Sequence, residues 1–142
     1  MFVRTKTPQR CILVSDLSGM AGLPPGRYGT ELCELEILSD GRLVIAGQDQ
    51  LLAGASLPIG VGVANVMAFA GVDLAAAVDM ASCQPAALVG LPTNRLGLGN
   101  PADLVLFDLQ ERPAETLPTR RAISLTVCQT ICSGQHRYDT SR

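Results

Sequence analysis

The sequence predicts an α/β fold in which a buried strand is followed by a hairpin, three helices and a group of strands. The first observation is the run Cys11-Ile12-Leu13-Val14, which lacks polar alternation and is typical of a parallel strand covered on both faces. The second is the helical pattern between residues 58 and 90. The third is the strand-like pattern between residues 102 and 133.

The stretch from Ser15 to Tyr28 is predicted to be an ordered loop, because it is rich in glycine and proline. Asp16 stands where the first strand ends. A carboxylate at the carboxyl end of a buried parallel strand lies where α/β barrels and open α/β sheets place their chemistry. The alternative from the local pattern is that Asp16 only caps the loop by accepting backbone N–H bonds.

A β-hairpin is predicted next, since residues 32–38 contain the alternating Glu-Leu-Glu-Ile, residues 39–42 form a turn and residues 43–46 return. Residues 50–57 then carry small side chains. At such a place the backbone can approach a ligand closely, or the segment can simply be a tight connection before a helix.

Three helices are predicted after the hairpin. The first runs from Pro58 to about Ala70, with Gly71 as its stop. The second follows Asp73 as N-cap and spans residues 74–82, and the third runs from Pro85 to about residue 90. Their methionines and phenylalanine are expected in the core.

The last part of the chain is predicted to be β-structure. Residues 102–108 form a strand, residues 111–121 an exposed connection, residues 122–133 two further strand pieces, and Gly134-Gln135 a turn before a polar tail. The Gly-Leu-Gly of residues 97–99 does not indicate a phosphate-binding loop, because a strand rather than a helix follows it.

The composition bounds the possible partners. The net charge of −2 and the pI near 5.3 give no basic field for nucleic acid or an anionic membrane. No apolar run reaches membrane-spanning length, and no signal peptide is recognised at the N-terminus. Because 47% of residues are hydrophobic and 17% charged, we expect surface that is covered by another subunit or by a missing part of the same fold.

The cysteines and the single histidine indicate neither disulfides nor a metal site. The five cysteines are odd in number and scattered, which favours a reducing cytoplasm. Cys128 and Cys132 on one strand would lie too far apart to bond. His136 is expected to be an exposed residue near the terminus rather than a ligand, and with no C-x-x-C the chain builds no zinc site from soft ligands.

The order of motifs resembles the carboxyl-terminal part of the N-acetylglucosamine-6-phosphate deacetylases, which are metal-dependent amidohydrolases. The resemblance covers roughly residues 11 to 135. The matching pieces are residues 13–16 (LVSD), 21–28 (AGLPPGRY), 52–57 (LAGASL), 79–82 (DMAS) with 84–86 (QPA), 95–97 (RLG) and 102–105 (ADLV). The last pieces specify only the superfamily, whereas the proline-glycine loop of residues 21–28 and the Leu-Ala-Gly of residues 52–54 point more narrowly to the deacetylases.

The resemblance implies the last βα unit of a (β/α)₈ barrel, with its eighth strand at residues 11–15, plus C-terminal strands of a small β-sandwich. The barrel would be incomplete, because one unit of eight cannot close it. The implied domains are residues 1–92, the end of the barrel, and residues 93–142, the sandwich strands.

The resemblance also implies the site. Asp16 matches the family's catalytic aspartate, a carboxylate that takes a proton from a metal-bound water and hands it to the departing sugar amine. Leu52, Ala53 and Gly54 match a segment whose backbone lines the amino-sugar phosphate site. The divalent metal, zinc or iron, would be held by a glutamate and two histidines of earlier barrel strands, which are not in this chain.

Three local departures accompany this resemblance. The chain has Ser-Asp-Leu at residues 15–17 where the family usually has Thr-Asp-Ala, and Gly-Ala-Ser at residues 54–56 where the family has Gly-Ser-Ser. Residues 99–101 (GNP) shorten the family's Gly-Lys-Asp before Ala-Asp-Leu.

The function expected from the resemblance is hydrolysis of the acetamide of N-acetylglucosamine 6-phosphate to glucosamine 6-phosphate and acetate, with this chain as a cytoplasmic C-terminal portion that is inactive alone. Its partner would be the N-terminal barrel portion or a second copy. One alternative is a non-catalytic interaction module derived from an amidohydrolase. Another is an amidohydrolase acting on a different N-acyl amino sugar or on a cyclic amide.

Overall fold

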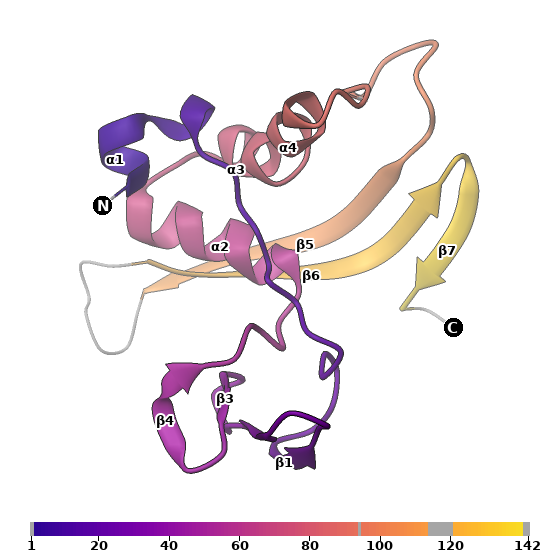
Figure 1. The fold of residues 1–142 in the computed structure, drawn as a ribbon. Coiled ribbons are helices and arrows are strands. Elements are labelled where there is room, and N and C mark those ends of the chain that lie inside the picture. Colours follow the sequence, from indigo (N-terminus) through magenta and orange to yellow (C-terminus); the bar gives the residue numbers. More distant parts are fainter. Residues whose placement is uncertain (1, 94, 114–120, 141–142) are drawn as a thin grey trace. The chain divides into compact units, whose positions relative to one another are not determined.

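A computed structural model describes residues 2–93, 95–113 and 121–140 of the chain (Figure 1). The chain divides into two compact units. One comprises Val14–Ile59, and the other combines Met1–Leu13 with Gly60–Arg142. In the described ranges, no helix combines the length and the apolar character needed to cross a membrane.

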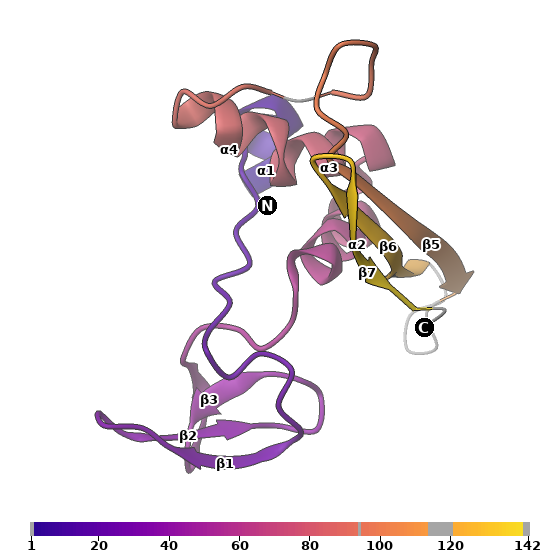
Figure 2. The same ribbon diagram turned by 90° about the vertical axis from the view of Figure 1, so that its right-hand side faces the viewer.

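The unit of residues 14–59 contains a four-stranded antiparallel sheet in the order β1-β2-β3-β4 (Figure 2). Its strands are β1 (Gly26–Gly29), β2 (Glu34–Ile37), β3 (Leu43–Ile45) and β4 (Gln48–Leu52). The predicted hairpin is confirmed as β2 and β3. Ile37, Leu43 and Val44 are buried and form the apolar centre of this unit.

Two strands of this sheet were not predicted. The β1 strand forms where the sequence predicted only loop, and its register pairs Arg27 with Glu36 so that an ion pair of 3.1 Å joins the two strands. The β4 strand is fully exposed and carries three polar residues in succession, so it lacks the alternation that identifies a half-buried strand.

The other unit contains the helices. They are α1 (Phe2–Lys6), the 3₁₀ turn η1 (Pro8–Arg10), α2 (Ile59–Ala70), α3 (Leu74–Ala81) and α4 (Cys83–Leu88). The first two helices predicted from the sequence are confirmed as α2 and α3. The third begins at Cys83, two residues before the predicted start, because Pro85 is tolerated within the first turn of a helix.

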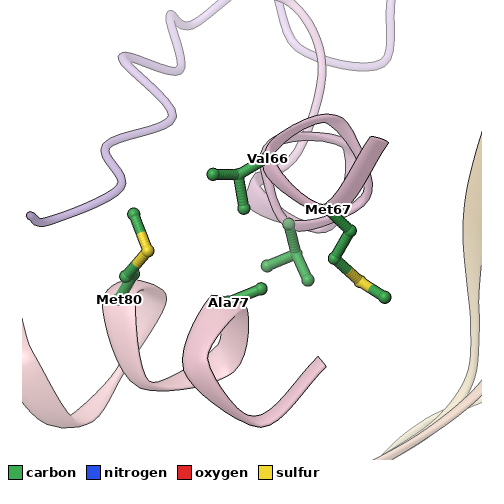
Figure 3. Packing of buried hydrophobic residues seen from close by; sticks show 5 residues of the cluster. Val66, Met67, Ala77 and Met80 are labelled. Atoms are coloured by element: carbon green, nitrogen blue, oxygen red, sulfur yellow. The ribbon is translucent and has the colours of Figure 1, made fainter. Parts of the chain in front are cut away.

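The core of this unit lies between α2 and α3. Val63, Val66 and Met67 of α2 form one buried cluster with Ala77 and Met80 of α3. Figure 3 shows four of these side chains, those of Val66, Met67, Ala77 and Met80, on the two neighbouring helices. Both methionines and all three other residues are buried, as the sequence predicted for Met67 and Met80. Phe69, also expected in the core, is instead 62% exposed.

A three-stranded antiparallel sheet packs against this helical core through Leu109, Ile123 and Leu125. Its strands are β5 (Leu104–Pro113), β6 (Arg121–Cys132) and β7 (Gln135–Asp139). Residues 122–133 were expected as two pieces, but residues 122–132 belong to the single strand β6 and Ser133 lies in the turn that follows it. The interruptions in the pattern are register shifts between Leu106 and Phe107 and between Thr130 and Ile131, which a β-bulge absorbs without ending a strand.

The ends of these strands correct two further expectations. The polar tail after the turn at Gly134 forms β7, because its backbone completes hydrogen bonds to β6. The connection expected over residues 111–121 begins only after Pro113, and the part from 114 to 120 lies outside the described residues.

The buried parallel strand expected at residues 11–15 is wrong for this structure. The segment is not in a sheet, although Leu13 donates a 2.9 Å hydrogen bond to the carbonyl of Met80. Val14 is 77% exposed, which contradicts burial on both faces. A strand needs a neighbouring ladder, and no strand among the described residues pairs with this segment. The structure is therefore a mixed α/β fold with two antiparallel sheets.

The division into domains of residues 1–92 and 93–142 stays a prediction.

Candidate functional site

Asp16 and the segment that follows β4 are hydrogen-bonded to each other. The carbonyl of Asp16 accepts a 2.8 Å bond from the Ala55 amide, and the Ala55 carbonyl accepts a 2.9 Å bond from the Ser18 amide. The two bonds form a short parallel bridge between Leu17 and Ala55. Two stretches that are almost forty positions apart in the sequence are thus joined at the residues predicted to carry chemistry.

Gly54, which precedes Ala55, leaves little room for a side chain next to Asp16. A Cβ atom built on Gly54 would lie 3.1 Å from the Asp16 carbonyl oxygen and 3.7 Å from Asp16 Oδ2. Gly54 has φ +89°, and Asp16 has φ 53°, so both residues occupy the left-handed region that glycine adopts freely and other residues rarely do. The side chain of Asp16 is exposed to solvent, as a group that exchanges protons with a substrate requires.

The segment carrying Gly54 is also held from its other side. Ala53 donates a 3.0 Å hydrogen bond to the carbonyl of Leu43 in β3. The Ser56 hydroxyl, which is buried, donates to the carbonyl of Gly41 in the β2–β3 turn. The predicted binding segment is therefore fixed between the Asp16 loop and the sheet.

The loop after Asp16 is ordered by its own hydrogen bonds, which confirms the expectation for its first half. The Ser18 hydroxyl accepts a 3.1 Å bond from the Met20 amide, and the Ser18 carbonyl accepts one from the Ala21 amide. Further along, the Tyr28 hydroxyl donates a 2.6 Å bond to the Pro24 carbonyl.

Among the predicted binding residues, Gly54 has a backbone N–H group that is free to donate a hydrogen bond to a substrate. The amides of Ala53 and Ala55 already donate within the protein, to Leu43 and Asp16. Within the described ranges, the Gly54 amide has no hydrogen-bond partner. Leu52 contributes a side chain that is 64% exposed at the end of β4.

Sequence reasoning missed the connecting role of Ala55 and Ser56. Both lie in the matching segment at residues 52–57, but neither has a side chain that suggests a task. The available signal was the succession of small residues in Ala-Gly-Ala-Ser, which permits backbones to approach closely.

The donors in this chain do not fit a metal centre by themselves. In residues 2–93, 95–113 and 121–140, no group of three or more His, Cys, Asp or Glu side chains is placed to hold a metal ion. Asp16 is a single carboxylate, and structural or catalytic sites for zinc need at least three protein ligands. His136 is exposed on β7, as predicted, and all five cysteines are free thiols.

The motifs at residues 79–82 and 95–97 are joined by an ion pair. Arg95 Nη2 lies 2.9 Å from Asp79 Oδ2, and this bond to Asp79 raises the pKa of Arg95. The carbonyl of Arg95 accepts a 2.7 Å bond from the Asn100 side chain. These contacts attach the loop before β5 to α3, so this pair of motifs has a structural task in the chain.

Comparison with known proteins defines the class. The model of the amidohydrolase family matches residues 28–136, and the chain therefore belongs to the amidohydrolase family. Members of this family are generally metal-dependent hydrolases. Its homologues within the family are deacetylases of amino-sugar phosphates.

Among these relatives, the N-acetylgalactosamine-6-phosphate deacetylase of Escherichia coli O157:H7 is 34% identical over 102 residues, which are 70% of this chain and 26% of the relative. The human N-acetylglucosamine-6-phosphate deacetylase is 32% identical over 103 residues, covering 71% of this chain and 25% of that protein. Across the curated relatives that it matches, the chain spans from 25% to 59% of their length.

Solved structures agree with this assignment. The N-acetylglucosamine-6-phosphate deacetylase of Thermotoga maritima superposes with a TM-score of 0.73 at 26% identity, over 97% of this chain and 34% of that one. A variant of the Mycobacterium smegmatis enzyme, in complex with N-acetyl-D-glucosamine-6-phosphate, has the same TM-score at 24% identity and covers 94% of this chain and 32% of that one. The fold of the chain is thus that of a part of these enzymes.

Proposed function

We propose that this chain contributes a proton-transferring carboxylate, Asp16, and a substrate-lining segment, Leu52-Ala53-Gly54, to a deacetylase of amino-sugar 6-phosphates. The observation that carries the proposal is the bridge between Leu17 and Ala55, because it brings the two predicted site segments together. Membership of the amidohydrolase family and the deacetylase relatives support the same reaction class.

The proposed reaction is hydrolysis of the acetamide of N-acetylglucosamine 6-phosphate. Water adds to the acetyl carbonyl carbon and the C–N bond breaks, giving acetate and glucosamine 6-phosphate. An exposed carboxylate can accept the proton of the attacking water and return it to the leaving nitrogen, a role that typically contributes about 10²–10⁴-fold. We assign this proton transfer to Asp16, and no step is assigned to a metal because the donors of this chain do not fit one.

The Gly54 amide is the group proposed to bind the substrate. It has no hydrogen-bond partner in the part of the chain that the structure describes, whereas the amides of Ala53 and Ala55 hold the segment in place. A substrate bound to this amide would lie near Asp16, because the adjacent Ala55 amide donates to the Asp16 carbonyl. Binding and proton transfer would therefore occur at one place in the unit of residues 14–59.

The chain is proposed to need further protein for turnover. Its deacetylase relatives are longer, and the chain covers 34% of the Thermotoga maritima structure. The partner would be a polypeptide that resembles the remaining part of such an enzyme, or a second copy of the chain.

A hybrid enzyme tests this proposal. The matched segment of the Thermotoga maritima deacetylase is replaced by this chain, and release of glucosamine 6-phosphate is measured with the hybrid and with the chain alone. We expect turnover by the hybrid, none by the chain alone, and a loss on the order of 10²–10⁴-fold in the Asp16→Asn hybrid.

Asp49→Asn is the matched control, since it removes an equally exposed carboxylate of the same unit on β4. It should leave the rate within about twofold, a surface effect of the size expected for sites away from the chemistry. A hybrid that folds but shows the same rate with Asp16→Asn as without it would contradict the role of Asp16.

A second substrate is favoured by one observation. The Escherichia coli relatives are N-acetylgalactosamine-6-phosphate deacetylases with 34% identity, slightly above the human enzyme. The hybrid is therefore assayed with both sugar phosphates, which differ only in the configuration at one hydroxyl. A higher kcat/KM for the galactosamine epimer would assign the chain to that substrate.

The exposed apolar side chains favour a second kind of function, a non-catalytic interaction module. Leu32, Leu88, Leu96 and Leu98 are each at least 75% exposed. Size-exclusion chromatography with light scattering separates the two functions. A single defined oligomer supports the module, whereas polydisperse material supports a chain that needs the rest of an enzyme.

A further inference from the structure

We propose that Gly54 is a positioning residue that holds the Asp16 carboxylate in its working orientation. The catalytic meaning of this inference rests on the proposed function, but the geometric claim can be tested on the chain itself. In this inference the absence of a side chain at Gly54 leaves room for Asp16, while the Gly54 amide remains the proposed binding group.

The space between the two residues is too small for a side chain. A Cβ on Gly54 would meet the Asp16 carbonyl oxygen at 3.1 Å, Asp16 Oδ2 at 3.7 Å and Ser18 Cβ at 3.9 Å. The Asp16 carbonyl oxygen cannot move away freely, because it accepts a 2.8 Å hydrogen bond from the amide of Ala55, the residue after Gly54. Any side chain at position 54 therefore pushes on Asp16 through its backbone.

Asp16 is sensitive to such a push because its backbone is held in a rarely populated conformation. Its φ of 53° lies in the left-handed region, which L residues other than glycine seldom occupy, although aspartate is among the more tolerant ones. The bridge to Ala55 fixes the peptide on both sides of Leu17. If this bridge breaks, Asp16 returns to the ordinary region and its side chain points elsewhere.

Gly47 provides a control for the backbone strain of any substitution. It has φ +79°, close to the +89° of Gly54, so an alanine is similarly strained at either position. A Cβ at Gly47 meets no atom within 4 Å, whereas a Cβ at Gly54 meets Asp16. The difference between Gly54→Ala and Gly47→Ala therefore isolates the contact with Asp16.

The first experiment is NMR spectroscopy on the full chain. Amide hydrogen exchange is followed at Ser18 and Ala55, and the backbone carbon shifts of Asp16 report its φ region. In the wild-type chain we expect both amides to be protected to the same degree. Gly54→Ala should reduce that protection on the order of tenfold or more and move the Asp16 shifts out of the left-handed range, while Gly47→Ala should leave both unchanged.

Two results would overturn the geometric claim. One is an Ala55 amide that exchanges at an unprotected rate in the wild-type chain, a measurement that stands even where the Gly54→Ala chain fails to fold. The other is that the Gly54→Ala and Gly47→Ala chains show the same amide exchange at Ser18 and Ala55 and the same Asp16 carbon shifts. For this comparison both chains must be folded, which the signals of Leu43 and Val44 report.

The second experiment is a double-mutant cycle in the hybrid enzyme. Gly54→Ala should lower kcat on the order of 10²-fold, the size of effect that a misplacement of about 1 Å produces. In the Asp16→Asn background the same substitution should change kcat by less than about threefold, because Gly54 acts through Asp16. Additive losses would overturn the positioning role.

The two failures are distinguishable. If the hybrid is inactive with the wild-type chain, the proposed function fails, and the NMR experiment still decides the geometry. If the hybrid is active but the cycle is additive, the function stands and the positioning role fails.

Discussion

At the turn between β2 and β3, Arg42 lowers the pKa of the Asp40 carboxyl group on the surface. Arg42 donates to it twice, from its backbone amide to Oδ1 at 3.0 Å and from its guanidinium Nε to Oδ2 at 2.8 Å. These bonds, the backbone one first, hold the pKa of Asp40 below its usual value of 3.8. Because a lowered pKa means that folding favours the charged form, the stabilising contribution is complete above the ordinary pKa and is lost as the pH falls through the folded-state pKa.

The first prediction follows for Arg42→Gln. The pKa of Asp40 should rise toward 3.8 without reaching it, because the backbone amide of residue 42 still donates to the carboxylate. The measurement is an NMR titration of the side-chain carboxyl carbon. Arg27→Gln, which removes the ion pair to Glu36 on β1 and β2, serves as control and should leave Asp40 unchanged. An unaltered Asp40 titration in Arg42→Gln would contradict the assigned cause.

At the scale of elements, the side chain of Asp73 caps the N-terminus of α3. It accepts a hydrogen bond from a first-turn amide that has no partner within the helix. The Asp73 carboxylate accepts a 2.8 Å bond from the Ala76 amide. Its backbone is extended, with φ −72° and ψ 165°, as is typical of an N-cap residue. The helix then contributes Ala77 and Met80 to the core. The cap thus fixes where the buried side of α3 starts.

The second prediction concerns this cap. Asp73→Ala should lower the free energy of unfolding by about 1 kcal/mol, whereas Asp73→Asn should cost much less because an amide oxygen also caps. Urea denaturation followed by far-UV circular dichroism measures both. Equal losses in the two variants would show that the charge or packing of Asp73, and not the cap, stabilises the helix.

The elements that could be predicted from sequence are those with local signals. The Asp73 cap and Gly71 mark the boundaries of α2 and α3, and the turn at residues 39–42 marks the hairpin. The segment at residues 11–15 was misassigned because an apolar run indicates burial, but only a neighbouring strand makes it part of a sheet. The β4 and β7 strands are exposed and polar, so their pairing is decided by the backbone of an adjacent strand and leaves little trace in their own sequence.

In the candidate site, too, some features have a signal in the local sequence and others depend on the fold. The importance of Asp16 could be predicted from a family resemblance, while the local pattern also allowed a mere cap. Its hydrogen bond from the Ala55 amide could not, because a bond between backbones separated by 38 intervening residues depends on the fold and not on side-chain type. The left-handed backbone of Asp16 was equally invisible, since aspartate occupies both ordinary and left-handed regions.

At the scale of the whole molecule, each unit has an apolar centre of its own. Ile37, Leu43 and Val44 are buried in the unit of residues 14–59, and the residues between α2 and α3 are buried in the other. The candidate site lies wholly in the first unit. The ion pair of Asp79 and Arg95 lies wholly in the second. Substitutions at the site therefore need a readout in residues 14–59, as the exchange experiment on Ser18 and Ala55 provides.

The strand β5 has a further consequence, for the colloidal behaviour of the chain. It hydrogen-bonds to β6 along one edge, and no other strand among the described residues pairs with it. It begins with four apolar residues, Leu104–Phe107, of which Val105 and Leu106 are about half exposed. An unpaired edge with this composition is a template for intermolecular cross-β growth.

Asp108 acts as the gatekeeper of this run, because its negative charge directly follows the apolar residues. We expect Asp108→Asn to shorten the lag time of thioflavin-positive fibril formation, and Asp49→Asn, with the same change in net charge, to leave it unaltered. The charge of Asp108 would thus keep this edge from seeding fibrils.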